Sequence, residues 1–72
     1  MSDSFKLRKI IYALNQLGFV VVRQKGSHML FEHKDGRITV VPAHKEIRVG
    51  LLIKIAKDIG MEKEEFFSLI KK

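Results

Sequence analysis

The sequence contains no cysteine, a single proline, and fewer acidic residues than basic ones. The absence of cysteine excludes a disulfide framework and a thiolate metal site. No hydrophobic run approaches the length of a membrane-spanning helix, and nothing at the N-terminus resembles an apolar signal segment. We therefore expect a soluble, cytoplasmic protein that does not insert into a membrane.

The chain is also too short for a large enzyme. Its 72 residues allow one domain, residues 1–72, and contain no linker, repeat or low-complexity segment. A chain of this size buries only about 60% of its unfolded surface, which leaves no room for both a core and a deep pocket. Any chemistry is therefore expected on an open surface, and this favours an extended polymer over a small metabolite as the substrate.

The charge balance points to the same class of partner. Fourteen Lys and Arg residues against eight Asp and Glu residues give a net charge of +6. Such a balance favours polyanions through phosphate contacts and counterion release. Charge alone does not separate RNA from DNA or from an acidic protein, so all three remain open at this point.

Apolar residues recur at helical spacing in two segments. A first helix is expected after Ser4 as N-cap and before Gly18, and a second from about Val49 to Gly60. A short third helix is expected over residues 62–70, with acidic residues in its first turn, where they suit the helix dipole. The apolar positions of the first helix are Leu7, Ile10, Ile11, Leu14 and Leu17, and those of the second are Leu52, Ile55, Ala56 and Ile59.

Three strands are expected between the first two helices, over residues 19–25, 27–33 and 37–41. Gly26 marks the first turn, Lys34-Asp35-Gly36 carries an Asp-Gly hairpin signal, and Pro42 ends the third strand. The order α-β-β-β-α-α predicts an α+β fold in which a three-stranded antiparallel sheet has its helices on one face. The other face of the sheet is then open.

The most informative segment is residues 23–28, Arg-Gln-Lys-Gly-Ser-His, in which a histidine directly follows a cationic turn. Imidazole titrates near neutral pH, so His28 has the properties of a proton-transfer group beside a phosphate site. The alternative is a hairpin histidine that only fills a partly exposed strand position. Because strand residues alternate between faces, His28 should point away from the core side of Met29 and Phe31, and His33 should lie on that core side. This parity argues against a His28–His33 metal pair, and we expect no metal site.

Each neighbour of His28 also has two interpretations. Arg23 and Lys25 either contact phosphate or are ordinary solvated charges. Gly26 either serves the backbone geometry of the turn or also lets a phosphate approach closely. Ser27 either donates a hydrogen bond to the substrate or stabilises the turn.

A second group of candidates follows Pro42. His44 is a secondary candidate for acid–base chemistry, and a structural role in the loop is the alternative. Lys45 and Arg48 extend the basic rim.

These motifs, in this order and at these intervals, resemble the HicA family of small bacterial and archaeal toxins, also called YcfA-like proteins. The resemblance covers about residues 5–70, and its most specific element is Gly26-Ser27-His28, supported by the later Pro42-Ala43-His44. It implies a fold similar to the double-stranded-RNA-binding domain and a ribosome-independent RNA endonuclease, an mRNA interferase, that is paired with a HicB antitoxin. By the same resemblance His28 matches the catalytic histidine. Because the three histidines lack recognisable ligand spacing, we expect the reaction to need neither a metal nor a cofactor. The chain departs from the family where Gly50-Leu51-Leu52-Ile53 replaces the usual Gly-Thr-Leu-Arg.

Two other classes of function remain as alternatives. One is a non-catalytic RNA-binding module of the same fold, in which His28 is only a contact residue. The other is a small scaffold whose basic face binds an acidic protein. The complete Gly-Ser-His segment favours the enzyme.

Overall fold

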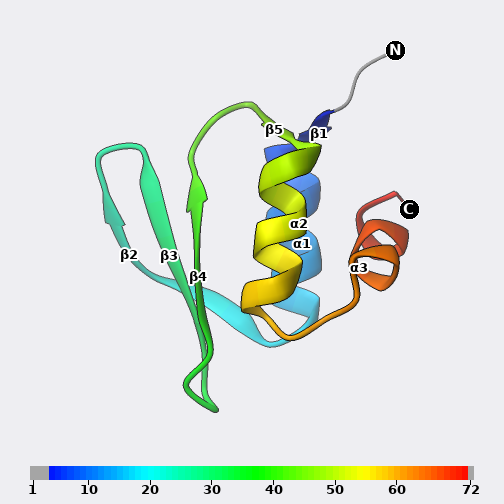
Figure 1. Ribbon diagram of the computed structural model, residues 1–72. Coiled ribbons are helices and arrows are strands. Elements are labelled where there is room, and N and C mark those ends of the chain that lie inside the picture. The colour runs from blue at the N-terminus through cyan, green and yellow to red at the C-terminus, as the bar shows by residue number, and fades with distance from the viewer. Residues whose placement is uncertain (1–3, 72) are drawn as a thin grey trace.

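The computed structural model describes residues 4–71, and its helices lie on one side of a three-stranded sheet (Figure 1). The sheet order is β2-β3-β4, and both pairings are antiparallel. This arrangement confirms the predicted α+β fold and the order α-β-β-β-α-α. The elements are β1 (Ser4–Lys6), α1 (Leu7–Gln16), β2 (Phe19–Lys25), β3 (His28–His33), β4 (Ile38–Pro42), β5 (Glu46–Arg48), α2 (Val49–Asp58) and α3 (Lys63–Ile70).

A second, two-stranded ladder joins the start of the chain to the segment before α2. Strands β1 and β5 pair antiparallel, with Phe5 opposite Ile47. The predicted N-cap role of Ser4 is wrong, because Ser4 lies in β1, opposite Arg48, and its Oγ donates a hydrogen bond to Glu46 Oε1 at 2.5 Å. The N-cap of α1 is instead Lys6, which makes no side-chain capping bond. Ser4 therefore contributes to the β1–β5 ladder rather than to the helix.

The other helix boundaries agree with the sequence pattern. Helix α1 ends at Gln16, and Gly18 follows with a positive φ of 94°, a conformation that favours glycine. Helix α2 ends at Asp58, two residues before Gly60. Helix α3 carries Glu64 and Glu65 in its first turn, as the dipole argument predicts.

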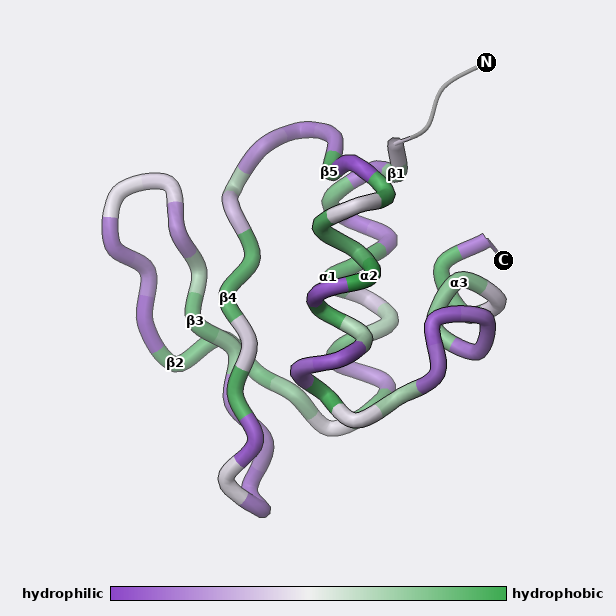
Figure 2. The backbone as a smooth tube through the Cα atoms, viewed as in Figure 1, coloured by the Kyte–Doolittle hydropathy of each residue, from purple (hydrophilic) through white to green (hydrophobic). Residues whose placement is uncertain are grey.

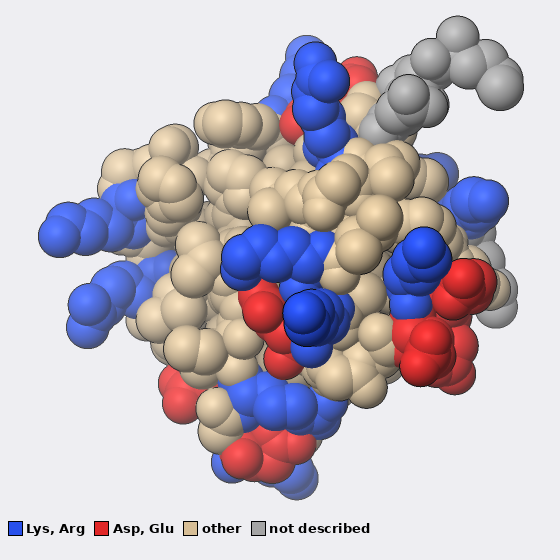
Figure 3. Space-filling view, in the orientation of Figure 1, with Lys and Arg blue, Asp and Glu red and all other residues tan. Residues whose placement is uncertain are grey.

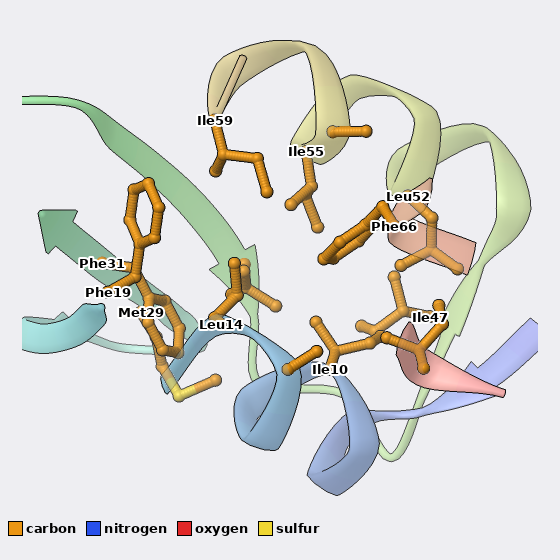
Figure 4. Close-up of a cluster of buried hydrophobic side chains, with 14 residues drawn as sticks. Ile10, Leu14, Phe19, Met29, Phe31, Ile47, Leu52, Ile55, Ile59 and Phe66 are labelled. Atoms are coloured by element: carbon orange, nitrogen blue, oxygen red, sulfur yellow. The ribbon is translucent and has the colours of Figure 1, made fainter. Parts of the chain in front are cut away.

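The core lies between the helices and the inner face of the sheet (Figure 4). Every apolar stripe predicted for the helices contributes to it, and α3 adds Phe66, which is fully buried. Thr39 is the only polar residue that is buried among residues 4–71. Its Oγ1 donates a hydrogen bond to Asp58 Oδ2 at 3.0 Å, which ties β4 to the end of α2. The fully buried side chains at the centre include Ile10, Leu14, Phe31, Val41, Leu52 and Ile55.

The outer face of the sheet has no element packed over it in Figure 1, and it exposes apolar side chains. The tube in Figure 2 shows that β2 is hydrophobic where it leaves α1 and hydrophilic toward its turn with β3. We call the apolar residues on this face the apolar stripe; they are the exposed Val20, Ile38 and Val40 and the half-buried Leu30. Val20 and Ile38 are each more than half exposed. Within residues 4–71, no helix has the length and hydrophobicity to cross a membrane.

Candidate functional site

The turn between β2 and β3 contains only two residues, Gly26 and Ser27, because Lys25 pairs directly with His28. Gly26 has a positive φ of 59°, the conformation that the first position of a tight two-residue hairpin requires. A Cβ atom added at Gly26 would meet nothing within 4 Å, so the space above this turn is open. The turn therefore presents Lys25 and His28 side by side at the end of the sheet.

A β-bulge at Val22 decides which face the cations of β2 occupy. The register shifts between Val21, which pairs with Phe31, and Arg23, which pairs with Leu30. Simple alternation would place Arg23 and Lys25 on the same face as Phe19, toward the core. The extra residue reverses this parity and moves both cations to the face of His28.

The cross-strand pairs then define the outer face row by row, since paired residues share a face. His28 is exposed on this face, and Met29 and Phe31 are buried on the other. This placement of His28 is the one that strand alternation predicts. From the turn inward the rows are Lys25–His28–Pro42, Arg23–Leu30–Val40 and Val20–Glu32–Ile38.

The ionisable side chains at this end of the sheet have no hydrogen-bond or ion-pair partner among the described residues. Within residues 4–71, no hydrogen bond or ion pair engages the side chains of Arg23, Lys25 or His28. No acidic residue occurs between Ser4 and Phe31 in the sequence, so α1 and β2 bring none to this region. Figure 3 shows Lys and Arg side chains projecting freely on the β2 side of the molecule, while acidic side chains gather near α3 and at the opposite end of the sheet. The free cations are thus available to an external anion.

The opposite end of the sheet is arranged differently, because its charged groups bind one another. Arg37 Nη2 pairs with Asp35 Oδ2 at 2.8 Å, and Arg37 Nη1 donates to the carbonyl oxygen of Ile59 at 2.5 Å. Hydrogen bonds from the Arg37 side chain and backbone hold the pKa of Asp35 at about 2, below its usual 3.8. The guanidinium group also lies 5.2 Å from the centroid of the Phe19 ring.

His33 belongs to this second end of the sheet and lies on the core side, as predicted. Its ring packs edge-on against Phe19 with the centroids 5.1 Å apart, and its Nδ1 accepts a hydrogen bond from the backbone N–H of Asp35 at 3.1 Å. A Cβ at Gly18 would lie 2.9 Å from His33 Nε2, so the glycine leaves the space that the ring needs. His33 is therefore a packing residue on the other side of the sheet from His28.

The second group of predicted site residues is only partly brought to His28. The backbone N–H of Ala43 donates to the carbonyl oxygen of Ser27, which places the start of the β4–β5 loop against the turn. His44 and Lys45 follow in this loop, and both are exposed. The carbonyl oxygen of Lys45 accepts a hydrogen bond from the backbone N–H of Leu7 at 2.9 Å, which carries the loop away toward α1. Arg48 lies farther on, in the β1–β5 ladder.

Sequence reasoning missed two basic residues near the β1–β5 ladder, Lys6 in β1 and Arg8 at the start of α1. They line a shallow depression together with Lys45 and Glu46. The available signal was the polar–apolar–polar pattern of both short segments, Ser4–Lys6 and Glu46–Arg48, although three residues are a weak strand signal. Within residues 4–71, no three His, Cys, Asp or Glu side chains lie close enough together to hold a metal ion.

Residues 7–61 match the family model described as the HicA toxin of bacterial toxin–antitoxin systems. The match covers most of the chain. The chain belongs to the HicA toxin family. No curated protein matches it.

Membership in the HicA family makes this chain the toxin half of a toxin–antitoxin pair and implies an antitoxin as its partner. The matched segment begins at the first residue of α1 and ends just before α3. It includes the whole sheet, both of its turns and the loop with His44. The candidate site thus lies entirely in the part of the chain that defines the family.

Proposed function

We propose that this HicA toxin is a ribosome-independent, metal-independent RNA endonuclease, an mRNA interferase, that uses His28 for acid–base chemistry. The observation that carries the proposal is the row Lys25–His28–Pro42, in which an exposed imidazole stands beside an ammonium group and neither has a partner within residues 4–71. Arg23 lies in the next row of the same face. The proposed RNA-binding residues are Arg23, Lys25, Gly26, Ser27, Lys45 and Arg48.

The chemistry is an internal transesterification of the RNA chain. The 2′-oxygen attacks the phosphorus atom, its proton passes to a base, the bond from phosphorus to the 5′-oxygen breaks, and the leaving oxygen takes up a proton. His28 serves one of these two proton transfers, a contribution of about 10²–10⁴ in rate. Lys25 and Arg23 stabilise the negative charge that accumulates on the phosphoryl oxygens. No water or metal ion is needed for this cleavage step.

The test is cleavage of matched RNA and DNA oligonucleotides by the purified toxin in excess chelator. Cleavage of RNA should continue in chelator, and a single 2′-deoxy substitution at the scissile position should block it there. Loss of activity in chelator with recovery on added magnesium would contradict the acid–base mechanism. Tight RNA binding without cleavage under any condition would support the alternative, a non-catalytic RNA-binding module.

We also propose that the antitoxin is HicB-like and inhibits the toxin by covering the outer face of the sheet. The apolar stripe directly adjoins the row of His28, and a monomer gains nothing by exposing Ile38 and Val20 to water. A partner that buries the stripe would cover His28 as well. Acidic residues on that partner would complement Arg23 and Lys25 and accelerate the encounter.

Hydrogen exchange of the toxin with and without the protein encoded by the neighbouring gene tests this arrangement. Binding should slow exchange over residues 23–30 and in the loop near His44. Replacing Ile38, at the far end of the apolar stripe, by Glu should weaken the complex without affecting RNA cleavage. Protection restricted to the helices, in a complex that still lacks RNase activity, would overturn the covering model.

A further inference from the structure

The pairing of β3 with β4 continues beyond the last residue of β4. His28 pairs with Pro42, and one step closer to the turn the backbone N–H of Ala43 donates to the carbonyl oxygen of Ser27. His44 is the next residue along the chain, so it leaves β4 close to the turn. Residues two positions apart in an extended chain share a face, so an extended chain through Ala43 would place His44 on the face of Pro42 and His28.

In that arrangement the two histidines would be diagonal neighbours across the end of the sheet. Diagonal positions in antiparallel strands lie about 7–8 Å apart, a spacing that long side chains bridge. The space over Gly26, next to the row of His28, is open. A phosphate group placed there would have one imidazole on each side and Lys25 next to it.

Neither histidine has a competing structural role. Both are exposed, and within residues 4–71 neither side chain makes a hydrogen bond, ion pair or ring contact. His33 provides the contrast within the same chain, since its ring is held by Phe19 and by the backbone of Asp35. Of the three histidines, His28 and His44 are the two that have no such contact within residues 4–71.

RNA cleavage requires two proton transfers at opposite sides of the phosphorus atom, because the 2′-oxygen enters opposite the leaving 5′-oxygen. One side chain on one side of the phosphate is poorly placed for both transfers. We propose that His44 is a second catalytic residue, and that His28 and His44 divide the roles of general base and general acid between them. This inference rests on the proposed RNase function and names the partner of His28 in it.

These two imidazoles account for both proton transfers of the cleavage step. One neutral imidazole takes the proton of the 2′-hydroxyl, and the other, in its protonated form, gives a proton to the 5′-oxygen as the bond to phosphorus breaks. The products are a 2′,3′-cyclic phosphate and a 5′-hydroxyl. Each histidine ends in the protonation state of the other, and exchange with water restores the pair.

The experiment compares His44→Gln and His28→Gln with the wild-type toxin on two substrates. One is an RNA oligonucleotide, and the other is uridine 3′-(4-nitrophenyl phosphate), whose leaving group departs without a proton. On the oligonucleotide both variants should lose about 10²–10⁴-fold in rate. On the activated substrate the variant that lacks the general acid should return to nearly the wild-type rate, and the other should not.

The pH dependence provides a second readout. The wild-type rate should follow a bell-shaped profile, and each variant should lose a different limb of it. Added imidazole should restore part of the activity of His44→Ala, and circular dichroism verifies that each variant is folded. His33→Gln serves as the control that removes a histidine outside the proposed pair and keeps both limbs.

Three results would overturn the inference: an unchanged rate for His44→Gln on RNA, a profile for this variant that keeps both limbs, or an equal loss by both variants on the activated substrate. A wild-type toxin that does not cleave RNA would instead contradict the proposed function itself. A toxin whose activity depends on His28 but not on His44 would leave the proposed function intact and would overturn only the proposed role of His44.

Discussion

The two turns of the sheet carry the same kinds of side chain but use them in opposite ways. Each turn has a glycine, a histidine and a basic residue next to it. At the β3–β4 turn Arg37 is held by Asp35 and by the carbonyl oxygen of Ile59, and His33 packs on Phe19. At the β2–β3 turn Lys25 and His28 make no such contacts within residues 4–71.

This difference shows how the same residue types acquire structural or functional roles. At the β3–β4 turn, hydrogen bonds and packing satisfy the polar groups, and these groups in turn fix the hairpin against α2 and β2. At the β2–β3 turn the charged groups are solvated by water, which a phosphate group could displace. The β2–β3 turn is therefore the candidate site because its ionisable groups have no partner within residues 4–71, and not because of its residue types alone.

The largest effect is expected from replacing the histidine at each of the two turns by alanine. His28→Ala should reduce RNA cleavage by about 10²–10⁴-fold without lowering the melting temperature, because the side chain is exposed and makes no hydrogen bond, ion pair or ring contact within residues 4–71. His33→Ala should keep its activity per folded molecule but lose about 0.5–1.5 kcal/mol of stability, the usual worth of an edge-on ring pair. Cleavage rates and thermal melts of both variants measure the comparison. An active His28→Ala protein, or an inactive but folded His33→Ala protein, would erase the distinction between the two turns.

An intermediate effect is expected from the lysines of the two turns. Lys25→Gln should weaken RNA binding uniformly across sequences, because phosphate contacts carry no base information. Loss of one phosphate contact should reduce the slope of log affinity against log salt by about 0.7 for a single strand. Binding is measured in a His28→Ala background so that the RNA stays intact.

Lys34→Gln is the matched control for this prediction, since Lys34 is an exposed lysine of the β3–β4 turn. It should leave both the affinity and the salt slope unchanged. Equal losses from Lys25→Gln and Lys34→Gln would mean that RNA binding follows net charge rather than the face defined by the bulge.

The smallest effect is expected at Asp35. The pKa of Asp35 is about 2 in the folded protein, compared with 3.8 for an aspartate without these interactions. The interaction of Asp35 with Arg37 therefore stabilises the fold above about pH 4, and this stabilisation is lost as the pH falls toward 2. Asp35→Asn should therefore be slightly less stable than the wild type at neutral pH, and the two should converge in acid. Melting temperatures between pH 2 and pH 7 test this, with Glu32→Gln, on the outer face, as the control. A constant difference across this range would show that Asp35 acts through its backbone turn and not through its charge.

Much of the fold could be predicted from the sequence because the relevant signals are local. The helical stripes, the Gly18 and Gly60 endings and the Asp-Gly turn are each set within a few residues. The β1–β5 ladder could not be predicted in this way, since two three-residue strands pair across about forty residues of chain. Ser4 was misassigned for the same reason: a serine before a helix is a typical N-cap, and only the distant Glu46 shows that it belongs to a strand.

The sequence by itself determined the basic charge, the three strands, the helical faces and the position of His28 on the outer face, because parity within β3 is regular. Only the tertiary structure decided the rest of the site. The bulge at Val22 reverses the parity of β2, so the face of Arg23 and Lys25 depends on how β2 pairs with β3. The nearness of His44 to the turn depends on the register of β4. Both depend on pairing between strands, which no local pattern in a single strand specifies.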